Sequence, residues 1–388
     1  MLHTPTTLTT LLLAAALGLP AHAFPQNDGA AGQQDARANG HAHTRRTDPA
    51  AQQPTRAETL FYLTDSDDGF ASFRDHLDAI SIVGPQSFAV DSDGVVWGEV
   101  DPRVLRLAKR HDVHVMPLVV NTGFSQAQIH ALLHNPTARA RAISQMVELG
   151  RRNGFWGWQF DLEDIHLTDR DSLTAFYRQT AKALRDAGMK LSIAVVPWDG
   201  RVGSTRWHRY MRADWREAYD VAALAKAGDF ISLMTYSQHN AGTPPGPVAG
   251  LPWMRANLRY TLAQGVPPDR ISLGVPTYSE HWQPGYQPGA AGTGGLHPTA
   301  REVSYARAMS FLSRYGVEPQ WLDKQGVHYA FWEHDGAFEY VFLEDRRSFA
   351  AKLDLMREKR LRGISVWVLG DEDPATWHVV HQELDVVH

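Results

Sequence analysis

Two carboxylates and an amide alternate along one short segment of the sequence. Gln159, Asp161 and Glu163 occupy every second position of residues 156–163, and the positions between them are apolar or glycine. Successive side chains of a β-strand point to opposite faces, so a strand here would gather the three polar groups on one face. Two buried carboxylates about 6 to 8 Å apart are costly unless they are paired, hydrogen-bonded or used in chemistry.

Such a pair also has a chemical use. The charge on one carboxylate disfavours ionisation of the other, and this effect can keep one acid protonated near neutral pH as a general acid. The same pattern has a structural interpretation, because two inward carboxylates can belong to a salt-bridge cluster or cap a helix at the strand end. The segment alone leaves both interpretations open.

A repeating pattern along the chain predicts the elements that must position these residues. From Glu58 onward, short apolar runs alternate with helical patterns, which is typical of βα units and a parallel sheet. Eight such units joined by right-handed crossovers predict a (β/α)8 TIM barrel, and no glycine-rich fingerprint follows the first strand to favour a doubly wound nucleotide-binding sheet. We expect strands at 60–63, 79–83, 113–120, 155–163, 190–196, 230–236, 271–276 and 363–369. We expect helices at 72–77, 102–110, 125–152, 171–187, 215–227, 253–263, 348–360 and 376–384.

The connection between the seventh strand and the seventh helix is longer than the others. Residues 283–343 contain a Gly/Pro-rich stretch at 283–299, a helical pattern at 303–315 and aromatic strand-like runs at 327–333 and 337–343. This content predicts a small α+β insertion on the rim of the barrel. The working face of such a barrel lies at the C-terminal ends of its strands, where we expect the site.

The composition excludes several classes of function. The 388 residues carry a formal net charge of −5, with a pI near 6.4, so there is no basic excess for nucleic acid or an anionic membrane surface. The chain has no cysteine, which excludes disulfides and a cysteine nucleophile. No segment has the roughly 18 to 20 consecutive apolar residues that a membrane span needs, and we expect a monomer without a membrane span.

The N-terminal region predicts export. Residues 1–23 contain an apolar run followed by a small-x-small cleavage site, which is typical of a signal peptide and of a secreted or periplasmic protein. Residues 24–56 are polar and predict a flexible linker, followed by the catalytic barrel at 57–388. His41 and His43 lie in this linker, where we expect them to be solvated rather than bound to a metal.

The segment with the two carboxylates resembles the strand-four signature of family 18 glycoside hydrolases, the chitinase-like family, usually written D-G-x-D-x-D-x-E. Gly157, Asp161 and Glu163 match this signature, whereas Trp156 and Gln159 stand where the family has acidic residues. The resemblance implies that Glu163 protonates the glycosidic oxygen. It also implies that Asp161 orients the N-acetyl group of the substrate, whose carbonyl oxygen attacks the anomeric carbon.

Further segments are similar to the same family in the same order. Residues 233–236 are similar to its M-x-Y-D segment, in which Tyr236 would hold the cyclised intermediate, with Ser237 in place of the Asp. Residues 363–373 are similar to its closing strand, in which Trp367 would form the floor of the subsite for the reacting sugar. The fifth and seventh strands also look like their counterparts. The resemblance runs from Glu58 to the C-terminus and looks closest to the bacterial branch related to spore-cortex and cell-wall hydrolases.

The resemblance and the strand positions together define a candidate site and a substrate. The implied substrate is a β-linked oligo- or polysaccharide that contains N-acetylglucosamine, and no metal or organic cofactor is implied. We expect Gln159 to support Asp161 by hydrogen bonding, which predicts retained activity with an altered pH profile. The expected catalytic residues are Glu163, Asp161 and Tyr236; the expected substrate-binding residues are Gln159, Trp367, Met234, Tyr278, Trp198 and Gln86; Tyr62, Asn121, Asp199 and Glu280 are further candidates at strand ends.

Two other functions remain open at this point. One is a retaining glycosidase in which Glu163 is the acid and Glu280 the nucleophile, which requires carboxyl groups about 5 to 5.5 Å apart. The other is a non-catalytic, lectin-like glycan-binding protein. The absence of acidic residues at positions 156 and 159 is the main support for the lectin.

Overall fold

The computed structural model describes residues 54–241, 243–287 and 295–388. The predicted signal peptide at 1–23, His41, His43 and nearly all of the predicted linker at 24–56 lie outside the described residues. The first strand begins at Thr55, two residues before the predicted start of the barrel. In the described part of the chain, no helix is both long and apolar enough to cross a membrane.

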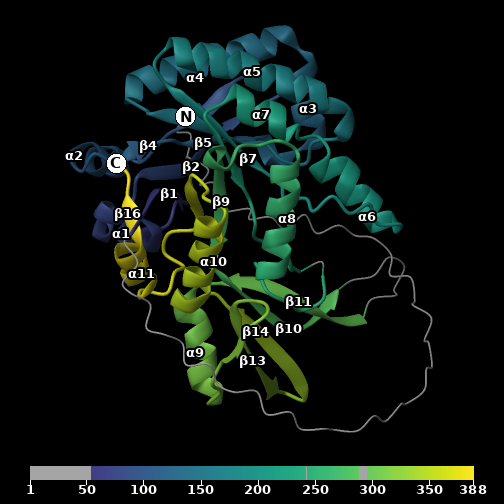
Figure 1. Ribbon diagram of the computed structural model, residues 1–388. Coiled ribbons are helices and arrows are strands. Elements are labelled where there is room, and N and C mark those ends of the chain that lie inside the picture. Colours follow the sequence, from purple (N-terminus) through teal and green to yellow (C-terminus); the bar gives the residue numbers. More distant parts are fainter. Residues whose placement is uncertain (1–53, 242, 288–294) are drawn as a thin grey trace, which may run out of the picture.

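Eight parallel strands close into a barrel, as predicted (Figure 1). The strands run around it in the order β1-β2-β5-β6-β7-β8-β9-β15, and pairing of β15 with β1 completes the ring. Three short strands extend the sheet outside this ring: β3 (Val96–Gly98), β4 (His114–Val115) and β16 (Leu384–Val386). The barrel strands are β1 (Thr55–Leu63), β2 (Ile82–Val90), β5 (Leu118–Asn121), β6 (Gly157–Asp161), β7 (Lys190–Val195), β8 (Phe230–Leu233), β9 (Ile271–Pro276) and β15 (Gly363–Trp367).

Helices surround the barrel, and their ends follow local capping signals. The helix predicted over 125–152 is two helices, because the Asn135 side chain accepts hydrogen bonds from the N–H groups of Thr137 and Ala138 and Pro136 starts the second helix. The helices are α1 (Asp67–Asp75), α2 (Pro102–Arg110), α3 (Gln126–His134), α4 (Pro136–Asn153), α5 (Arg170–Asp186), α6 (Arg206–Tyr210), α7 (Val221–Ala227), α8 (Leu251–Ala263), α10 (Arg346–Glu358) and α11 (Thr376–Glu383).

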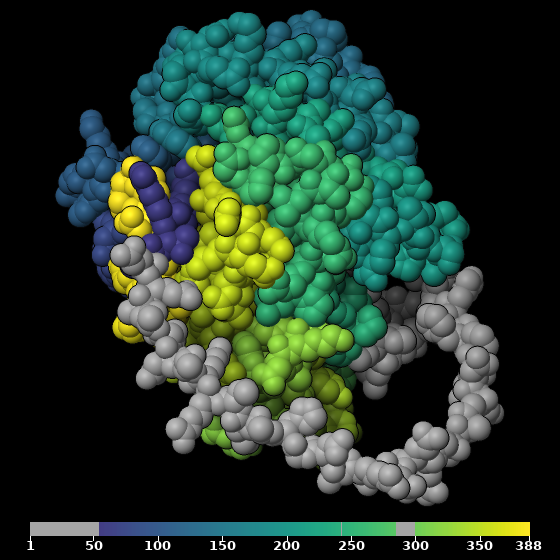
Figure 2. Space-filling view, in the orientation of Figure 1, coloured from purple at the N-terminus to yellow at the C-terminus, as the bar shows by residue number. Residues whose placement is uncertain are grey.

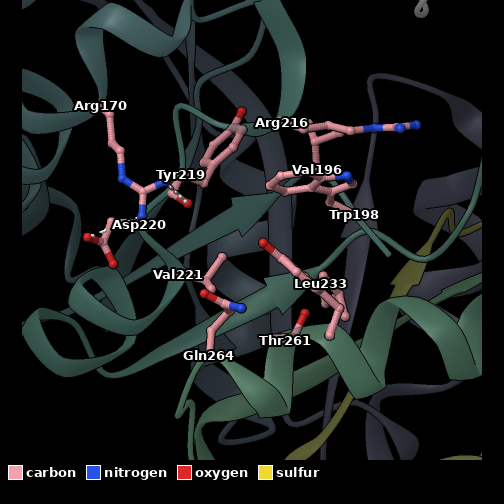
Figure 3. A pocket seen from close by; sticks show the side chains of 11 residues that line it. Arg170, Val196, Trp198, Arg216, Tyr219, Asp220, Val221, Leu233, Thr261 and Gln264 are labelled. Atoms are coloured by element: carbon pink, nitrogen blue, oxygen red, sulfur yellow. Dashed lines mark hydrogen bonds and ion pairs between the residues drawn. The ribbon is translucent and has the colours of Figure 1, made fainter. Parts of the chain in front are cut away.

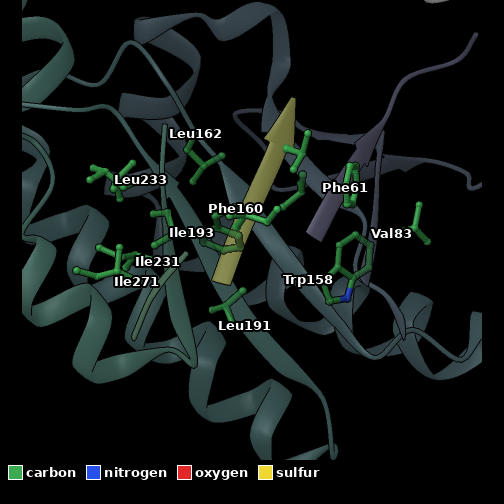
Figure 4. Close-up of a cluster of buried hydrophobic side chains, with 14 of the residues drawn as sticks. Phe61, Val83, Trp158, Phe160, Leu162, Leu191, Ile193, Ile231, Leu233 and Ile271 are labelled. Carbon is green, nitrogen blue, oxygen red and sulfur yellow. The ribbon is translucent and has the colours of Figure 1, made fainter. Parts of the chain in front are cut away.

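The alternation along β6 sorts its side chains as predicted. Trp158, Phe160 and Leu162 are buried in the main apolar core, which lies between the strands and the helices (Figure 4). Gln159 and Asp161 point the other way, into the barrel, whose interior also holds a separate apolar cluster that includes Tyr62, Met116, Leu118 and Phe230. Burial of each large apolar side chain contributes about 1.5 to 3 kcal/mol, so the outward face anchors the strand that carries the carboxylates.

The rim insertion is a five-stranded antiparallel sheet with one helix, which confirms the predicted α+β insertion. Its sheet has the order β11-β10-β14-β13-β12, and helix α9 (Tyr305–Tyr315) packs Ala308 and Leu312 against the sheet. Figure 2 shows α8 and α10 side by side on the face turned to the viewer, with the insertion beneath them. The strands are β10 (Ser279–Gln287), β11 (Gly295–Val303), β12 (Gln320–Leu322), β13 (Val327–His334) and β14 (Ala337–Leu343).

Candidate active site

The two carboxylates of β6 lie at the C-terminal end of the barrel, where the sequence places the site. Asp161 is the last residue of β6 and Glu163 follows two positions later. Both side chains are buried, with 4% of Asp161 and 5% of Glu163 exposed. Gln86 of β2, which lies two strands from β6 around the ring, interacts with the Asp161 carboxylate and lowers its pKa.

Burial controls the protonation of this pair. It raises the pKa of Asp161 to about 6, against hydrogen bonds with Glu163 and Gln86 that lower it. Burial also raises the pKa of Glu163 well above its usual range, and the negative charges of Asp161 and Asp164 raise it further. The pair therefore holds a proton on Glu163 near neutral pH while Asp161 is ionised, which is the state that a general acid requires.

The backbone that carries Glu163 is fixed by side chains from other elements. The Asn121 amide, at the end of β5, donates to the Glu163 carbonyl oxygen at 3.0 Å and accepts from the Glu163 N–H at 3.0 Å. The Tyr219 hydroxyl donates to the Leu162 carbonyl oxygen at 2.6 Å. Asp164 then adopts a left-handed conformation with a φ of 51°, which turns the chain away from the strand. Hydrogen bonds thus fix the N–H and C=O groups of Glu163 and the C=O group of the residue before it.

Two expected aromatic residues, Tyr236 and Trp367, follow or end barrel strands at the same end of the barrel as these carboxylates. Burial raises the pKa of Tyr236 well above its ordinary value, and the charges of Asp161 and Glu163 raise it further, so its hydroxyl is a neutral donor close to the pair. Trp367, at the end of β15, packs its ring 5.5 Å from the ring of Tyr62 on the neighbouring strand β1.

Two more expected residues continue from the end of β8. Met234 directly follows this strand and is buried, with 9% exposed. The Tyr278 hydroxyl hydrogen-bonds to the hydroxyl of Ser237, which follows Tyr236, at 2.8 Å. Tyr278 is almost fully buried, so its contacts make it a support for the chain after Tyr236.

Gln159 does not make the contact that we expected. Its side-chain nitrogen donates to the hydroxyls of Ser192 at 2.9 Å and Ser232 at 3.0 Å, which uses both of its N–H donors. Its side-chain oxygen is buried without a hydrogen-bond partner, so neither atom of the amide bonds to Asp161. Gln159 is also completely buried, below the carboxylates in the barrel interior. The expected hydrogen bond to Asp161 is therefore wrong, and the residue has the contacts of an interior polar group rather than of a substrate ligand.

Trp198 also lies away from the carboxylates. Its ring is 5.0 Å from that of Tyr260 on α8, and both residues line a pocket together with Val196 and Leu233 (Figure 3). Leu233 belongs to the core between the strands and the helices, so this pocket is on the outer side of the barrel wall. Neither Asp161 nor Glu163 lines it. The contacts of Trp198 therefore do not support its expected role in substrate binding.

Glu280 lies on β10 of the insertion and has a different electrostatic environment. It pairs across the sheet with Glu302, and burial together with the charge of Glu302 raises the pKa of Glu280 to about 8. The charged neighbours that perturb Glu163 are Asp161 and Asp164. A carboxyl group that stays protonated at neutral pH is a poor nucleophile, so this environment argues against the two-carboxylate mechanism with Glu163.

Comparison with known proteins shows the family of this chain. The family model described as glycosyl hydrolases family 18 matches residues 41–373, a range that contains the carboxylate pair, Tyr236 and Trp367. The chain belongs to family 18 of the glycosyl hydrolases.

Two relatives of this family 18 chain come from Bacillus subtilis. It is 32% identical over 248 residues to the sporulation-specific glycosylase YdhD of Bacillus subtilis, a match that covers 64% of this chain and 54% of that protein. It is 27% identical over 312 residues to the cortical fragment-lytic enzyme of the same species, a match that covers 79% of this chain and 69% of that protein. The chain thus spans about half the length of the first of these relatives.

Solved structures show the same fold. The spore cortex-lytic enzyme SleL of Bacillus megaterium superposes with a TM-score of 0.76 at 25% identity, covering 86% of this chain and 75% of that one. A chitinase from Chromobacterium violaceum superposes with a TM-score of 0.74 at 25% identity, covering 84% of this chain and 98% of that one. These findings confirm the family and the barrel that the sequence predicts.

Proposed function

We propose that this family 18 hydrolase cleaves β-linked glycans that contain N-acetylglucosamine, by a substrate-assisted mechanism that retains the anomeric configuration. The observation that carries the proposal is the buried Asp161–Glu163 pair, in which Glu163 is protonated and Asp161 ionised near neutral pH. Tyr236 adds a neutral hydroxyl close to both.

In the first step, the bond to the leaving sugar breaks. Glu163 transfers its proton to the glycosidic oxygen while the carbonyl oxygen of the substrate's own 2-acetamido group attacks the anomeric carbon. Asp161 orients the acetamido N–H and stabilises the positive charge of the cyclic intermediate. The Tyr236 hydroxyl holds this group in the orientation for attack, and a well-oriented internal nucleophile removes much of the entropic barrier.

In the second step, water opens the ring that the acetamido group formed, and the bond between the acetamido oxygen and the anomeric carbon breaks. The Glu163 carboxylate takes a proton from a water molecule, and the water oxygen forms a bond to the anomeric carbon. The acetamide is restored and Glu163 is protonated again. Two displacements on opposite faces return the product with the original configuration.

The relatives narrow the class of glycan. One is named for lysis of cortical fragments and another for lysis of the spore cortex, while a third is named a chitinase. These names support glycans with N-acetylglucosamine units in a cell-wall context as substrates of this chain.

The predicted leader at 1–23 supports export, and N-terminal sequencing of the mature protein would test the predicted cleavage after Ala23.

One experiment distinguishes the substrate-assisted mechanism from the two-carboxylate mechanism in which Glu280 is the nucleophile. N-acetylglucosamine oligomers, their deacetylated counterparts and peptidoglycan glycan strands are incubated with wild-type enzyme, and reducing ends are measured. We expect release only from acetamido-bearing sugars, and a loss of about 10² to 10⁴ in rate for Glu163→Gln.

Glu280→Gln is the matched control, since it makes the same chemical change at a second buried glutamate. We expect Glu280→Gln to keep most of the activity. A loss for Glu280→Gln as large as that for Glu163→Gln, or equal hydrolysis of deacetylated sugars, would reject the substrate-assisted mechanism.

A further inference from the structure

Two histidines and one aspartate converge on the flank of the barrel, apart from the carboxylate pair. His130 and His134 lie one turn apart on α3, and Asp169 ends η3 (Leu167–Asp169), the short helix before α5. Helices α3 and α5 lie side by side in Figure 1. The His130 Nδ1 atom is 2.9 and 3.0 Å from the two carboxylate oxygens of Asp169, and the His134 Nε2 atom is 2.8 Å from one of them.

The aspartate of this cluster is an unusual buried anion. Its side chain is 1% exposed, and within the described part of the chain its ion-pair partners are these two histidines, with no lysine or arginine. The neighbouring Arg170 is directed elsewhere, to the carbonyl oxygens of Glu217 and Tyr219. A buried carboxylate without a permanent cation is costly, so a bound cation would stabilise this cluster.

The donor atoms match a transition metal. One atom from each residue, two imidazole nitrogens and one carboxylate oxygen, can be chosen so that all lie within 4.8 Å of one another. Histidines four apart on a helix present their rings on one face, and imidazole with carboxylate suits Zn²⁺ better than Ca²⁺ or Mg²⁺, which prefer oxygen ligands. Zinc holds such ligands at about 2.0 to 2.2 Å, so donor atoms around one tetrahedral ion lie roughly 3.4 Å apart. Each nitrogen would move away from the Asp169 oxygen by about half an ångström, and the two nitrogens, which lie within 4.8 Å of each other, would adjust to the same spacing.

The exposure of the cluster fits a three-ligand site with one open position. The two imidazole side chains are 57% and 49% exposed, so their rings can adjust and water can reach the fourth coordination position. We propose that His130, His134 and Asp169 form a Zn²⁺ site that fastens α3 to η3. The binding of Zn²⁺ would replace the contacts between the two imidazole nitrogens and the carboxylate with metal–ligand bonds, and each neutral imidazole would carry its proton on the other ring nitrogen.

The position of the site links it to the catalytic segment. At the other end of α3, Gln126 donates to the Asp164 carboxylate at 3.3 Å, and Asp164 directly follows Glu163. Asp169 ends the same connection after β6. A metal here would therefore fix α3 to the Asp169 end of residues 164–169, while the bond from Gln126 holds the Asp164 end. It would raise the stability of the fold without entering the chemistry.

Metal titration of the full chain tests the proposal. Protein produced without a polyhistidine tag is stripped with a chelator, and Zn²⁺ binding is measured by calorimetry. We expect the wild type to bind one Zn²⁺ more than the His130→Gln/His134→Gln variant, and its melting temperature to rise with Zn²⁺. Asp169→Asn, which removes a ligand charge at constant size, should weaken this binding by about tenfold or more, since loss of even an outer-shell partner costs about 10- to 100-fold.

A second histidine pair provides the matched control. His378 and His381 are exposed on α11, and His381 is 4.0 Å from an exposed aspartate, Asp78. His378→Gln/His381→Gln should bind as much Zn²⁺ as the wild type. Equal Zn²⁺ stoichiometry in the wild type and in folded His130→Gln/His134→Gln would overturn the proposal. Should that variant not fold, unchanged affinity in Asp169→Asn, or no extra visible absorption when Co²⁺ is added to the wild type, would overturn it.

Discussion

Replacement of Asp161 by asparagine should stabilise the fold while it disables the site. Burial raises the pKa of Asp161 from 3.8 to about 6 in the folded protein. The folded state therefore binds a proton more readily than the unfolded state between these values, and the free energy of unfolding must fall as the pH rises through this range. A rise of this size corresponds to a stability penalty of about 3 kcal/mol above pH 7.

Asparagine has nearly the same shape as aspartic acid but carries no charge, so Asp161→Asn removes this penalty. We expect the free energy of unfolding of the variant to exceed that of the wild type by up to about 3 kcal/mol at pH 8. The difference should be less than about 1 kcal/mol near pH 4, where Asp161 is protonated in the folded state and only partly ionised in the unfolded state. Hydrolysis should drop by about 10²-fold or more, because the acetamido group loses its orienting charge.

Urea unfolding at several pH values between 4 and 8 measures the difference. The slope of the unfolding free energy against urea should be the same for both proteins, so that the midpoint reports stability directly. Asp323→Asn, at an exposed position on the insertion, is the control and should follow the wild type at every pH. Curves for Asp161→Asn and wild type that stay parallel from pH 4 to pH 8 would refute the reasoning, as would a variant that is less stable at pH 8.

Two further substitutions test how Glu163 is held and how the pair is tuned. Asn121→Ala removes both hydrogen bonds to the Glu163 backbone and leaves two buried groups unpaired. We expect a loss of about 2 to 4 kcal/mol in stability and of about tenfold or more in kcat, with little change in KM. A kcat equal to that of the wild type would contradict the positioning role of Asn121. Gln159→Asp adds a carboxylate on the same face of β6, two residues before Asp161, which should raise the pKa of Asp161 and move the acidic limb of the pH–rate profile upward. An unchanged pH–rate curve would show that position 159 does not affect the pair.

Strand periodicity predicts most of the barrel, because the buried outer face of each strand requires apolar residues at every second position. The second strand shows where this signal ends. It was expected at 79–83 and runs from Ile82 to Val90, through Pro85, Gln86 and Ser87. Gln86 and Ser87 interrupt the apolar pattern in the middle of the strand, and Gln86 interacts with Asp161, so this part of the strand departs from a hydrophobic pattern at the site.

Partners of polar side chains could not be predicted in the same way. The type and strand position of Asn121 marked it as a candidate, but its two bonds to Glu163 depend on how β5 and β6 are staggered. Tyr219 lies just before α7, far from β6 in sequence, and nothing in its neighbourhood signals a bond to Leu162. Trp198 follows a barrel strand as expected of a sugar-stacking residue, yet the chain turns it toward α8. These outcomes depend on tertiary contacts that local patterns do not contain.

The residues at positions 156 and 159 bear on whether the site is catalytic. Trp156 stacks on His114 with ring centroids 4.7 Å apart, and it packs against the apolar cluster inside the barrel. Gln159 bonds to serine hydroxyls, so the interior beneath Asp161 is uncharged at both positions where the family has acids.

The proton on Glu163 does not depend on those missing acids. Its pKa is raised by burial first and then by Asp161 and Asp164, all of which are present in this chain. The main support for a non-catalytic lectin is therefore weak, because the groups that would make Glu163 an acid are intact. Single-turnover hydrolysis of N-acetylglucosamine oligomers decides between the two functions: an enzyme must cleave much faster than its Glu163→Gln variant, whereas a lectin would show the same negligible rate for both.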